Sequence, residues 1–457
     1  MKSETRIDEI KKITDRDDLF MMKEIMWQGG LEKMRVHKIP LEYLLYNKYN
    51  GRILSRTKSL EAQGKELNPE NEDDKKIIQD LLWYSKEQKN KKTLEDIRKN
   101  GQIEVGVITR DGIIIDGNRR AMLLNRVDGQ THFKAVVLPV ALAEDLIEIK
   151  KLETSIQMGE DAKLGYNPIE KYLTTAELVK QGVELIDIAQ WMGETETTIK
   201  EYNNIMVIMD EYLDYLDYND IYTQLDGRED HFINLSKWIN NFKGLDSARA
   251  FNGYGNDDVD DLKTVCFDYI RATFEGKNFR KIAKGNKENH FFGNKDVWSD
   301  FTESHFKSMR PINDLEEPIN TDTNDLKATL DDRDTRFRND ANSLLQNNFD
   351  EAENKLRFKK HKDEPLKLVK SAERALETIN PHSGAFKESE AGDKLNELRD
   401  KIDGMLKDTP MVTLQYIMKL LEDFSNLEVE KDDRNDISRE LTVIQKRAFD
   451  LSKNFKR

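Results

Sequence analysis

The residues with the clearest chemical role lie between positions 100 and 127. A run of apolar β-branched residues ends in Asp116, Gly117 permits a tight backbone turn, and Arg119 and Arg120 follow at the expected start of a helix. Free backbone amides and the positive end of a helix attract an anion, and arginine side chains add charge-assisted hydrogen bonds. The pattern predicts a phosphate-binding site, although an isolated pair of arginines more often forms ordinary surface ion pairs.

The elements around these arginines indicate a mixed α/β fold. Two segments carry apolar residues at helical spacing, and Gly101 is a suitable end for the second helix. Two β-branched runs joined by an Asp-Gly turn are typical of a β-hairpin. The predicted order is helix, helix, strand, strand, helix and strand, over residues 75–88, 91–101, 105–109, 112–116, 117–127 and 132–140.

This pattern resembles the N-terminal domain of the ParB/sulfiredoxin superfamily, in which a Gly-Gln helix end and two strands precede a Gly-Glu-Arg-Arg motif. Residues 183–205 are similar to the helix–turn–helix that follows in ParB proteins. The resemblance implies an α+β ParB/Srx-like domain, then an all-α helix–turn–helix segment and a helical C-terminal region. Further matches in the same order are Ile39-Pro40, Asn47, Tyr49 and Arg52 upstream, and Ile156-Gln157 and Asn167 to Glu170 downstream.

In ParB proteins, CTP phosphates contact the Gly-Glu-Arg-Arg loop and an upstream arginine, and the base lies near the Gly-Gln turn. The resemblance therefore implies that this chain binds CTP or ATP, with Mg²⁺ as a further ligand. The nucleotide-binding residues predicted in this way, together with the carboxylate that ends the strand, are Arg52, Gly101, Gln102, Asp116, Gly117, Asn118, Arg119 and Arg120.

Two departures from the family pattern concern hydrolysis. Asn118 replaces the glutamate of the loop motif, and Thr154 and Ser155 stand where ParB has the glutamate and asparagine linked to hydrolysis and magnesium. A hydroxyl group cannot replace a carboxylate that orients water or a metal ion. Glu153 is one residue away and could be the catalytic residue only after a shift in register. We therefore expect nucleotide binding without fast hydrolysis, as in a weak NTPase.

The helix–turn–helix segment leaves two interpretations open. Thr195, Thr197, Thr198 and Lys200 lie at the start of the expected recognition helix, where they could contact DNA bases or phosphates. Between residues 181 and 202, however, five acidic side chains accompany a single basic one. Since phosphate neutralisation supplies much of the affinity for DNA, the segment is either a DNA reader or a structural helical module.

Composition bounds the class of protein. The chain has 457 residues, with 87 acidic and 73 basic side chains and a net charge of −14, which excludes a generally basic nucleic-acid coat. Residues 1–150 hold 28 basic and 26 acidic side chains, so we assign the acidic excess to the helix–turn–helix segment and the tail. A single cysteine, no export signal and no apolar span predict a cytoplasmic protein without a membrane partner. The histidines lack metal-ligand spacing, so no metal site is predicted.

Shifts in composition and the positions of glycine and proline predict five regions. In the first region, apolar residues from Leu19 to Trp27 suit one amphipathic helix. In the second, residues 55–74 are polar enough for an exposed loop. The regions are an N-terminal helical extension (1–35), a ParB/Srx-like nucleotide-binding domain (36–150), a helix–turn–helix-like helical domain (151–225), a helical middle region (226–322) and an acidic helical-bundle tail (323–457).

Three functions agree with these features. The first is a ParB-like, nucleotide-dependent switch or regulator associated with DNA in a prokaryotic or phage context. A protein partner or a second copy would bind through its helical region. The second is a ParB-like nuclease or nucleotide hydrolase that uses the carboxylates of Asp116, Glu153 and Glu160. The third is an adaptor with a vestigial pocket, whose tail binds a partner in a role such as mobile-element defence.

Overall fold

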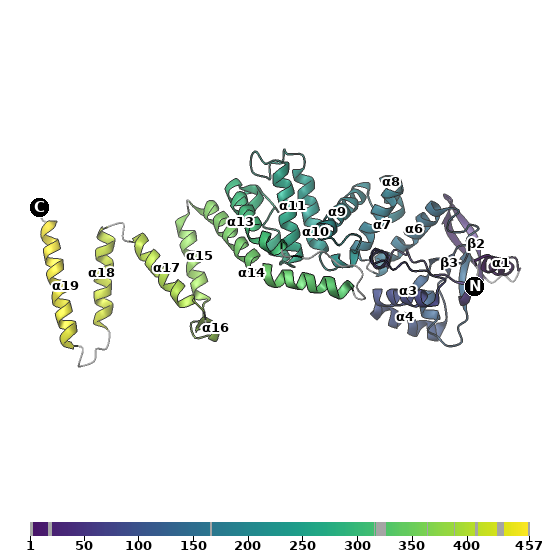
Figure 1. The fold of residues 1–457 in the computed structure, drawn as a ribbon, viewed down its shortest axis with the longest axis horizontal. Helices are drawn as coiled ribbons and strands as arrows, with labels where there is room; N and C mark the ends of the chain where they lie inside the picture. The colour runs from purple at the N-terminus through teal and green to yellow at the C-terminus, as the bar shows by residue number, and fades with distance from the viewer. Residues whose placement is uncertain are drawn as a thin grey trace. The chain divides into compact units, whose positions relative to one another are not determined.

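A computed structural model describes residues 3–16, 21–164, 167–314, 316, 326–362, 364–387, 389–406, 410–426 and 434–455. The chain divides into two compact units, Met1–Lys362 and Asp363–Arg457. The first unit has a small mixed sheet near its N-terminus and helices thereafter, and the second contains helices (Figure 1). This order agrees with the predicted α+β region followed by helical regions. Across the described ranges, no helix combines the length and the apolar character that a membrane crossing requires.

Five strands form the sheet, in the spatial order β1-β2-β5-β3-β4. Neighbouring strands are antiparallel, except that β3 and β5 run parallel. The predicted hairpin is confirmed as β3 and β4, and the predicted strand after it as β5. The bounds are Met22–Trp27 for β1, Gly30–Pro40 for β2, Gly106–Ile108 for β3, Ile114–Asp116 for β4 and His132–Val137 for β5.

Helices cover both faces of this sheet. Consecutive strand residues point to opposite faces, so that Ile108 joins one apolar core and Val107 the other. The first core also takes residues from α3, α4 and α5, and the second takes residues from α6. The bounds are Glu72–Ser85 for α3, Glu87–Asn100 for α4, Asn118–Leu124 for α5 and Leu146–Leu164 for α6.

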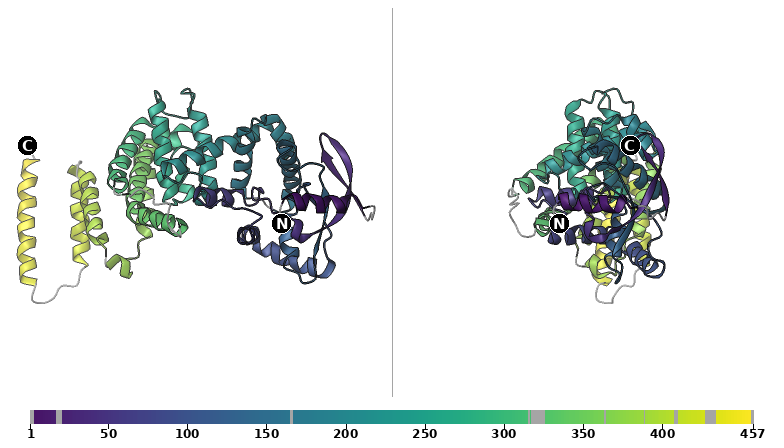
Figure 2. Two further views of the ribbon diagram at one scale, coloured as in Figure 1. Left: turned by 45° about the vertical axis from the view of Figure 1, so that its right-hand side comes forward. Right: turned by 90° about the vertical axis from the view of Figure 1, so that its right-hand side faces the viewer.

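The N-terminal region differs from the prediction of one amphipathic helix from Leu19 to Trp27. The structure has a helix, α1 (Ser3–Thr14), and then the β1–β2 hairpin, the purple ribbon of two strands in Figure 2. The helix prediction is wrong because positive φ angles at Gln28-Gly29 reverse the chain and β2 pairs with the distant β5. Trp27 is buried, while residues 17–20 lie outside the described ranges.

The exposed loop predicted over residues 55–74 is present only in part, at residues 63–71, which lie between helices and are mostly exposed. Helix α2 (Leu54–Ala62) covers the first part of the segment, and its polar residues Ser55 and Ser59 are buried. Burial costs little here because both hydroxyls are satisfied: Ser55 Oγ donates to Glu170, and Ser59 Oγ donates to the Ser55 carbonyl at 2.7 Å. A polar composition therefore does not place the whole of this segment in solvent.

The predicted helix–turn–helix-like region contains α7 (Pro168–Lys180), α8 (Leu185–Met192) and α9 (Glu196–Tyr215). These helices enclose a small apolar core of their own. Gly193 ends α8 in the left-handed conformation, and the side chain of Thr195 caps α9. Helices α8 and α9 are thus joined by a short turn with defined caps.

A larger core joins the middle region to the helix that follows it. Leu330, Phe337 and Leu345 of that helix, α14, are fully or almost fully buried in this core. The first unit therefore extends to Lys362, whereas the sequence predicts a boundary after residue 322. The helices around the core are α10 (Glu229–Phe242), α11 (Asn256–Arg271), α12 (Gly276–Phe279), α13 (Lys295–Asn313) and α14 (Leu326–His361).

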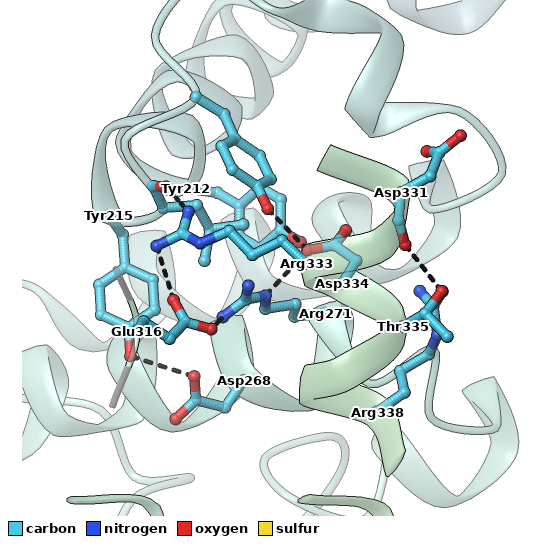
Figure 3. A network of polar contacts seen from close by, with 12 residues as sticks. Tyr212, Tyr215, Asp268, Arg271, Glu316, Asp331, Arg333, Asp334, Thr335 and Arg338 are labelled. Carbon is cyan, nitrogen blue, oxygen red and sulfur yellow. Dashed lines mark hydrogen bonds and ion pairs between the residues drawn. The ribbon is translucent and has the colours of Figure 1, made fainter. Parts of the chain in front are cut away.

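A buried network of charges links α14 to the rest of this core (Figure 3). Asp334 of α14 accepts hydrogen bonds from Arg271 Nε at 2.9 Å, from Arg228 Nη2 at 3.2 Å and from the Tyr218 hydroxyl at 2.9 Å. Glu316 binds Arg271 from the other side at 2.6 Å. Because Asp334 and Arg271 are both almost fully buried, each charge depends on its partners.

The second unit has helices without a buried core of their own. They are α15 (Pro365–Glu377), α16 (Gly384–Lys387), α17 (Ala391–Leu406), α18 (Pro410–Ser425) and α19 (Arg434–Asn454). Of the residues that the structure describes from 364 to 455, none is buried. Large apolar side chains such as Met405, Leu414 and Phe449 are exposed.

The acidic excess lies elsewhere than the sequence analysis assigned it. Residues 323–457 hold 28 acidic and 26 basic side chains, so the tail is close to neutral. Residues 151–322 hold 33 acidic and 19 basic side chains. Their net charge of −14 equals that of the whole chain. The description of the tail as acidic is therefore wrong, and the excess belongs to the helix–turn–helix and middle regions.

Candidate functional site

The predicted arginine motif lies where β4 leads into α5. Gly117 connects the two elements with φ of 101°, in the left-handed region that favours glycine. A Cβ atom at this position would lie 2.7 Å from Cζ of Phe133, which is closer than nonbonded carbon atoms approach. The turn therefore requires glycine for two reasons, and it directs the start of α5 toward the end of the sheet.

A cavity of about 360 Å³ lies at this turn, and we call it the arginine cavity. Arg52, from the segment before α2, and Arg119 and Arg120, from α5, line it together. Asp116, Gly117 and Asn118 also line it, so six of the eight residues predicted to bind nucleotide share one cavity. The other lining residues are Asn50, Thr93, Glu104, Ile115, Leu123 and Gln157.

Arg119 is oriented by a buried amide. Asn90 Oδ1 accepts hydrogen bonds from Arg119 Nε at 2.9 Å and from Nη2 at 2.6 Å. Asn90 is fully buried in α4, and its Nδ2 donates to the carbonyls of Leu82 and Trp83 at 3.0 and 2.7 Å. Since an amide is neutral, this contact positions the guanidinium without neutralising it.

Arg120 contacts the carboxylate that ends β4. Its Nη2 donates to the two oxygens of Asp116 at 2.9 and 3.0 Å, and Asp116 is itself buried. Lys23 of β1 places Nζ 3.7 Å from the same carboxylate and donates to the carbonyl of Val105. Two cations therefore share one buried anion at this wall of the cavity.

Glu153 lies in a cluster of amides next to the arginine cavity. Its carboxyl group accepts hydrogen bonds from the side chains of Asn50 and Gln157, both at 2.9 Å, and of Asn47 at 3.2 Å. Burial raises the pKa of Glu153 from 4.5 to about 7, although these hydrogen bonds and Lys150 favour the charged form. Asn50 and Gln157 line the cavity, so Glu153 is connected to it without lining it.

Asn118 and the Gly-Gln turn serve the fold. Asn118 Oδ1 accepts from the backbone amide of Asn47 at 3.0 Å, and its Nδ2 donates to the Ile114 carbonyl at 2.9 Å. Gly101 ends α4 with a positive φ of 71°. The Gln102 side chain bonds to the backbone of Lys134 in β5: it accepts from the Lys134 amide at 2.6 Å and donates to the Lys134 carbonyl. Neither Gly101 nor Gln102 lines the arginine cavity.

The residues predicted to contact DNA lie elsewhere, at the start of α9. Thr195 accepts a hydrogen bond from the Thr198 amide at 3.1 Å, and the two hydroxyls are 2.9 Å apart. The Thr195 side chain therefore caps the helix. Thr195, Thr197 and Lys200 are exposed, and of these three Thr197 and Lys200 take no part in the cap.

Three polar residues that shape the site were missed by the sequence prediction: Lys23, Asn50 and Asn90. Lys23 and Asn50 reach the site through contacts between distant segments, which no local pattern reveals. Asn90 had a local signal, because it shares one face of its helix with Leu94 and Ile97. A polar side chain on an apolar face needs a buried partner.

The carboxylates predicted for a nuclease form no metal centre in the described structure. Asp116 is bonded to Arg120, Glu153 is bonded to amides, and the side chain of Glu160 lies outside the described residues. Within the described ranges, no group of three or more His, Cys, Asp or Glu side chains could hold a metal ion. A Mg²⁺ ion would therefore be held chiefly by the phosphates of a bound nucleotide.

Comparisons with known proteins identify no family. No protein-family model and no curated protein matches the sequence. Among solved structures, the chain is similar to the C-terminally truncated chromosome-partitioning protein ParB from Caulobacter crescentus, complexed to the centromeric parS site. The identity is 14% over 54% of this chain and 97% of that chain, with a TM-score of 0.28. Similarity at this level does not establish a shared fold, so the ParB/sulfiredoxin resemblance remains a prediction.

Proposed function

We propose that this protein binds a nucleoside triphosphate, CTP or ATP, with its phosphates in the arginine cavity. The observation that carries the proposal is the convergence of Arg52, Arg119 and Arg120 on one cavity of about 360 Å³. Arginine is suited to phosphate because its planar donors form paired hydrogen bonds. The volume lies in the range that small ligands occupy in protein pockets.

The cavity is preorganised for an anion. Asn90 holds Arg119 and the Asp116 carboxylate holds Arg120, so fixed contacts orient both guanidiniums. Side chains that are already held lose less conformational entropy when a ligand binds. Arg52 approaches from a segment distant in sequence, so a ligand bound by all three arginines would join that segment to α5. This supports a role as a nucleotide-dependent switch.

The positions of the carboxylates support nucleotide binding without fast hydrolysis. A general base must reach the attacking water by a hydrogen bond. Asp116 bonds to Arg120, and Glu153, which does not line the cavity, bonds to three side-chain amides. Neither carboxylate is poised for that contact.

Calorimetric titration of the full chain with CTP, ATP and GTP tests the proposal. We expect binding of CTP or ATP by the wild type and a loss of at least about tenfold in affinity for the combined variant Arg119→Ala, Arg120→Ala. Arg126→Ala is the matched control, because Arg126 pairs with Asp80 at 3.4 Å and does not line the cavity. Absence of binding by all three nucleotides would refute the proposal.

A DNA-associated role is a second candidate, supported by the helix–turn–helix geometry of α8 and α9. Exposed Thr197 and Lys200 lie in the first turns of α9. Fluorescence anisotropy with a mixed-sequence duplex, with and without nucleotide, tests this role. We expect Lys200→Glu to weaken DNA binding more than Lys180→Glu, which changes a lysine at the end of α7. Equal affinities for the two variants would favour a structural module.

A further inference from the structure

A second cavity adjoins the arginine cavity. Its volume is about 500 Å³, and Arg52 lines both cavities. Its other walls come from the junction of α3 and α4, from α2 and from the start of α7. Arg52 is therefore the residue that the two cavities have in common.

The second cavity has an exposed aromatic ring in its wall. Tyr84, near the end of α3, has 71% of its surface exposed although it lines the cavity with Leu81 and Pro168. An exposed aromatic ring can stack with a planar ligand. Single exposed apolar residues are common on proteins, so the position of this ring beside Arg52 is what gives it significance.

The segment that carries Tyr84 is fixed by Asn90, the same residue that orients Arg119. Asn90 Nδ2 donates to the carbonyls of Leu82 and Trp83, immediately before Tyr84, while Asn90 Oδ1 accepts from Arg119. One buried amide thus sets the position of a phosphate-binding arginine and of the neighbouring aromatic residue. This arrangement couples the geometry of the two cavities.

Polar groups also line the second cavity. Glu170, which is buried, accepts hydrogen bonds from Ser55 N at 3.0 Å and from Ser55 Oγ at 2.6 Å. Asn167 uses its Oδ1 to cap α7. Arg56 pairs with Asp226 at 2.6 Å. Amide, carboxyl and guanidinium groups beside an aromatic ring match the donors and acceptors on the edge of a nucleobase.

We propose that the second cavity is the base subsite of the nucleotide: the base stacks on Tyr84 and the phosphates occupy the arginine cavity. Arg52 then lies between the two parts of the ligand. This inference rests on the proposed nucleotide function, and it places the base away from the Gly101-Gln102 turn, where the family resemblance implies it.

Titration with a nucleotide and with inorganic tripolyphosphate separates the two proposals. For Tyr84→Ala in the full chain, we expect affinity for CTP or ATP to fall by at least about fivefold, the lower end of measured base–aromatic stacking. Affinity for tripolyphosphate should stay unchanged, since it has no base. Tyr84→Phe should retain nucleotide affinity, and Tyr416→Ala, an exposed tyrosine of α18, should match the wild type.

The outcomes distinguish failure of either proposal. Wild-type nucleotide affinity in Tyr84→Ala would overturn the base subsite and leave the phosphate site standing. An equal loss of tripolyphosphate and nucleotide binding in Tyr84→Ala would also overturn it, because the residue would then act on the phosphates or on the fold. Binding of neither ligand by the wild type would overturn the proposed function and the base subsite with it.

Discussion

Glu153 combines deep burial with bonds to three neutral amides. Its carboxyl group is surrounded by the side chains of Asn47, Asn50 and Gln157, and burial raises its pKa to about 7. A carboxyl group with a raised pKa is harder to ionise in the folded protein than in the unfolded chain. Its contribution to stability is therefore present in full below about pH 4.5 and is lost as the pH rises through about 7.

The first prediction follows from this titration. Glu153→Gln removes the ionisable group, so we expect the free energy of unfolding of the variant to depend less on pH between about 4.5 and 7 than that of the wild type. Urea denaturation at several pH values across this range measures the free energy of unfolding of the variant and of the wild type. Glu148→Gln, which changes a half-buried glutamate of the same helix that pairs with Lys151 at 3.3 Å, should follow the wild type. An unchanged pH slope in Glu153→Gln would contradict the prediction.

Asn90 acts as a positioning residue for Arg119. Removing its amide in Asn90→Ala deletes the contacts to Arg119 and to two backbone carbonyls. We expect a loss of about 1–3 kcal/mol in stability and weaker nucleotide binding, because Arg119 is no longer held. Denaturation and calorimetry measure the two effects. Asn100→Ala, whose exposed side chain bonds to Asp96, is the control, and equal behaviour of the two variants would argue against the positioning role.

At the scale of the element, the β4–α5 turn depends on Gly117. Gly117→Ala adds a Cβ 2.7 Å from Phe133 at a positive φ, so we expect destabilisation and reduced nucleotide binding. Gly129→Ala is a matched control, since Gly129 also has a positive φ of 80° but no atom within 4 Å of the added Cβ. Gly117→Ala should be the less stable variant by at least about 1 kcal/mol. Equal melting temperatures would show that the close approach to Phe133 is unimportant.

Elements with strong local signals were predictable from the sequence. The hairpin of β3 and β4 has an Asp-Gly turn, and α7 and α9 have the capping residues Asn167 and Thr195. The β1–β2 hairpin was not predicted, because its register depends on pairing with β5, which follows much later in the chain. Helix α2 was missed because the buried hydroxyl of Ser55 depends on Glu170 of a distant helix. Local patterns do not contain such contacts.

The candidate site also has residues with a local sequence signal and residues that depend on distant contacts. The arginines, Asp116 and Gly117 belong to one short motif and were found from its pattern. Arg52 was found only through the family resemblance. Lys23 and Asn50 reach the site by tertiary contacts alone. The charged residues of the β4–α5 motif were thus predictable from a local pattern, and the residues that position them were not.

At the scale of the whole molecule, α14 is held in the first unit by its buried charge network. Asp334→Ala would leave Arg271 and Arg228 buried without their shared anion. We expect a loss of about 3–5 kcal/mol in the free energy of unfolding. Asp332→Ala, which removes an exposed partner of Arg336 on the same helix, should change stability by less than about 0.5 kcal/mol. Similar denaturation curves for the two variants would contradict this account.

The acidic excess of the first unit and the exposed apolar side chains of the second favour different roles for the two units. The acidic excess of residues 151–322 opposes DNA binding by α9 alone, so a DNA-associated role would need a further cation-rich partner or a change on nucleotide binding. The exposed apolar side chains of α15 to α19 support a partner or second copy at the second unit. That role remains a prediction from the sequence.

The central claim is that Arg52, Arg119 and Arg120 together bind the phosphates of a nucleotide. A crystal structure of the full chain with a non-hydrolysable analogue of CTP or ATP tests this most directly. We predict phosphate density in the arginine cavity, with guanidinium groups of all three residues within hydrogen-bonding distance. Nucleotide density at another position, with the arginine cavity free of phosphate, would contradict the claim.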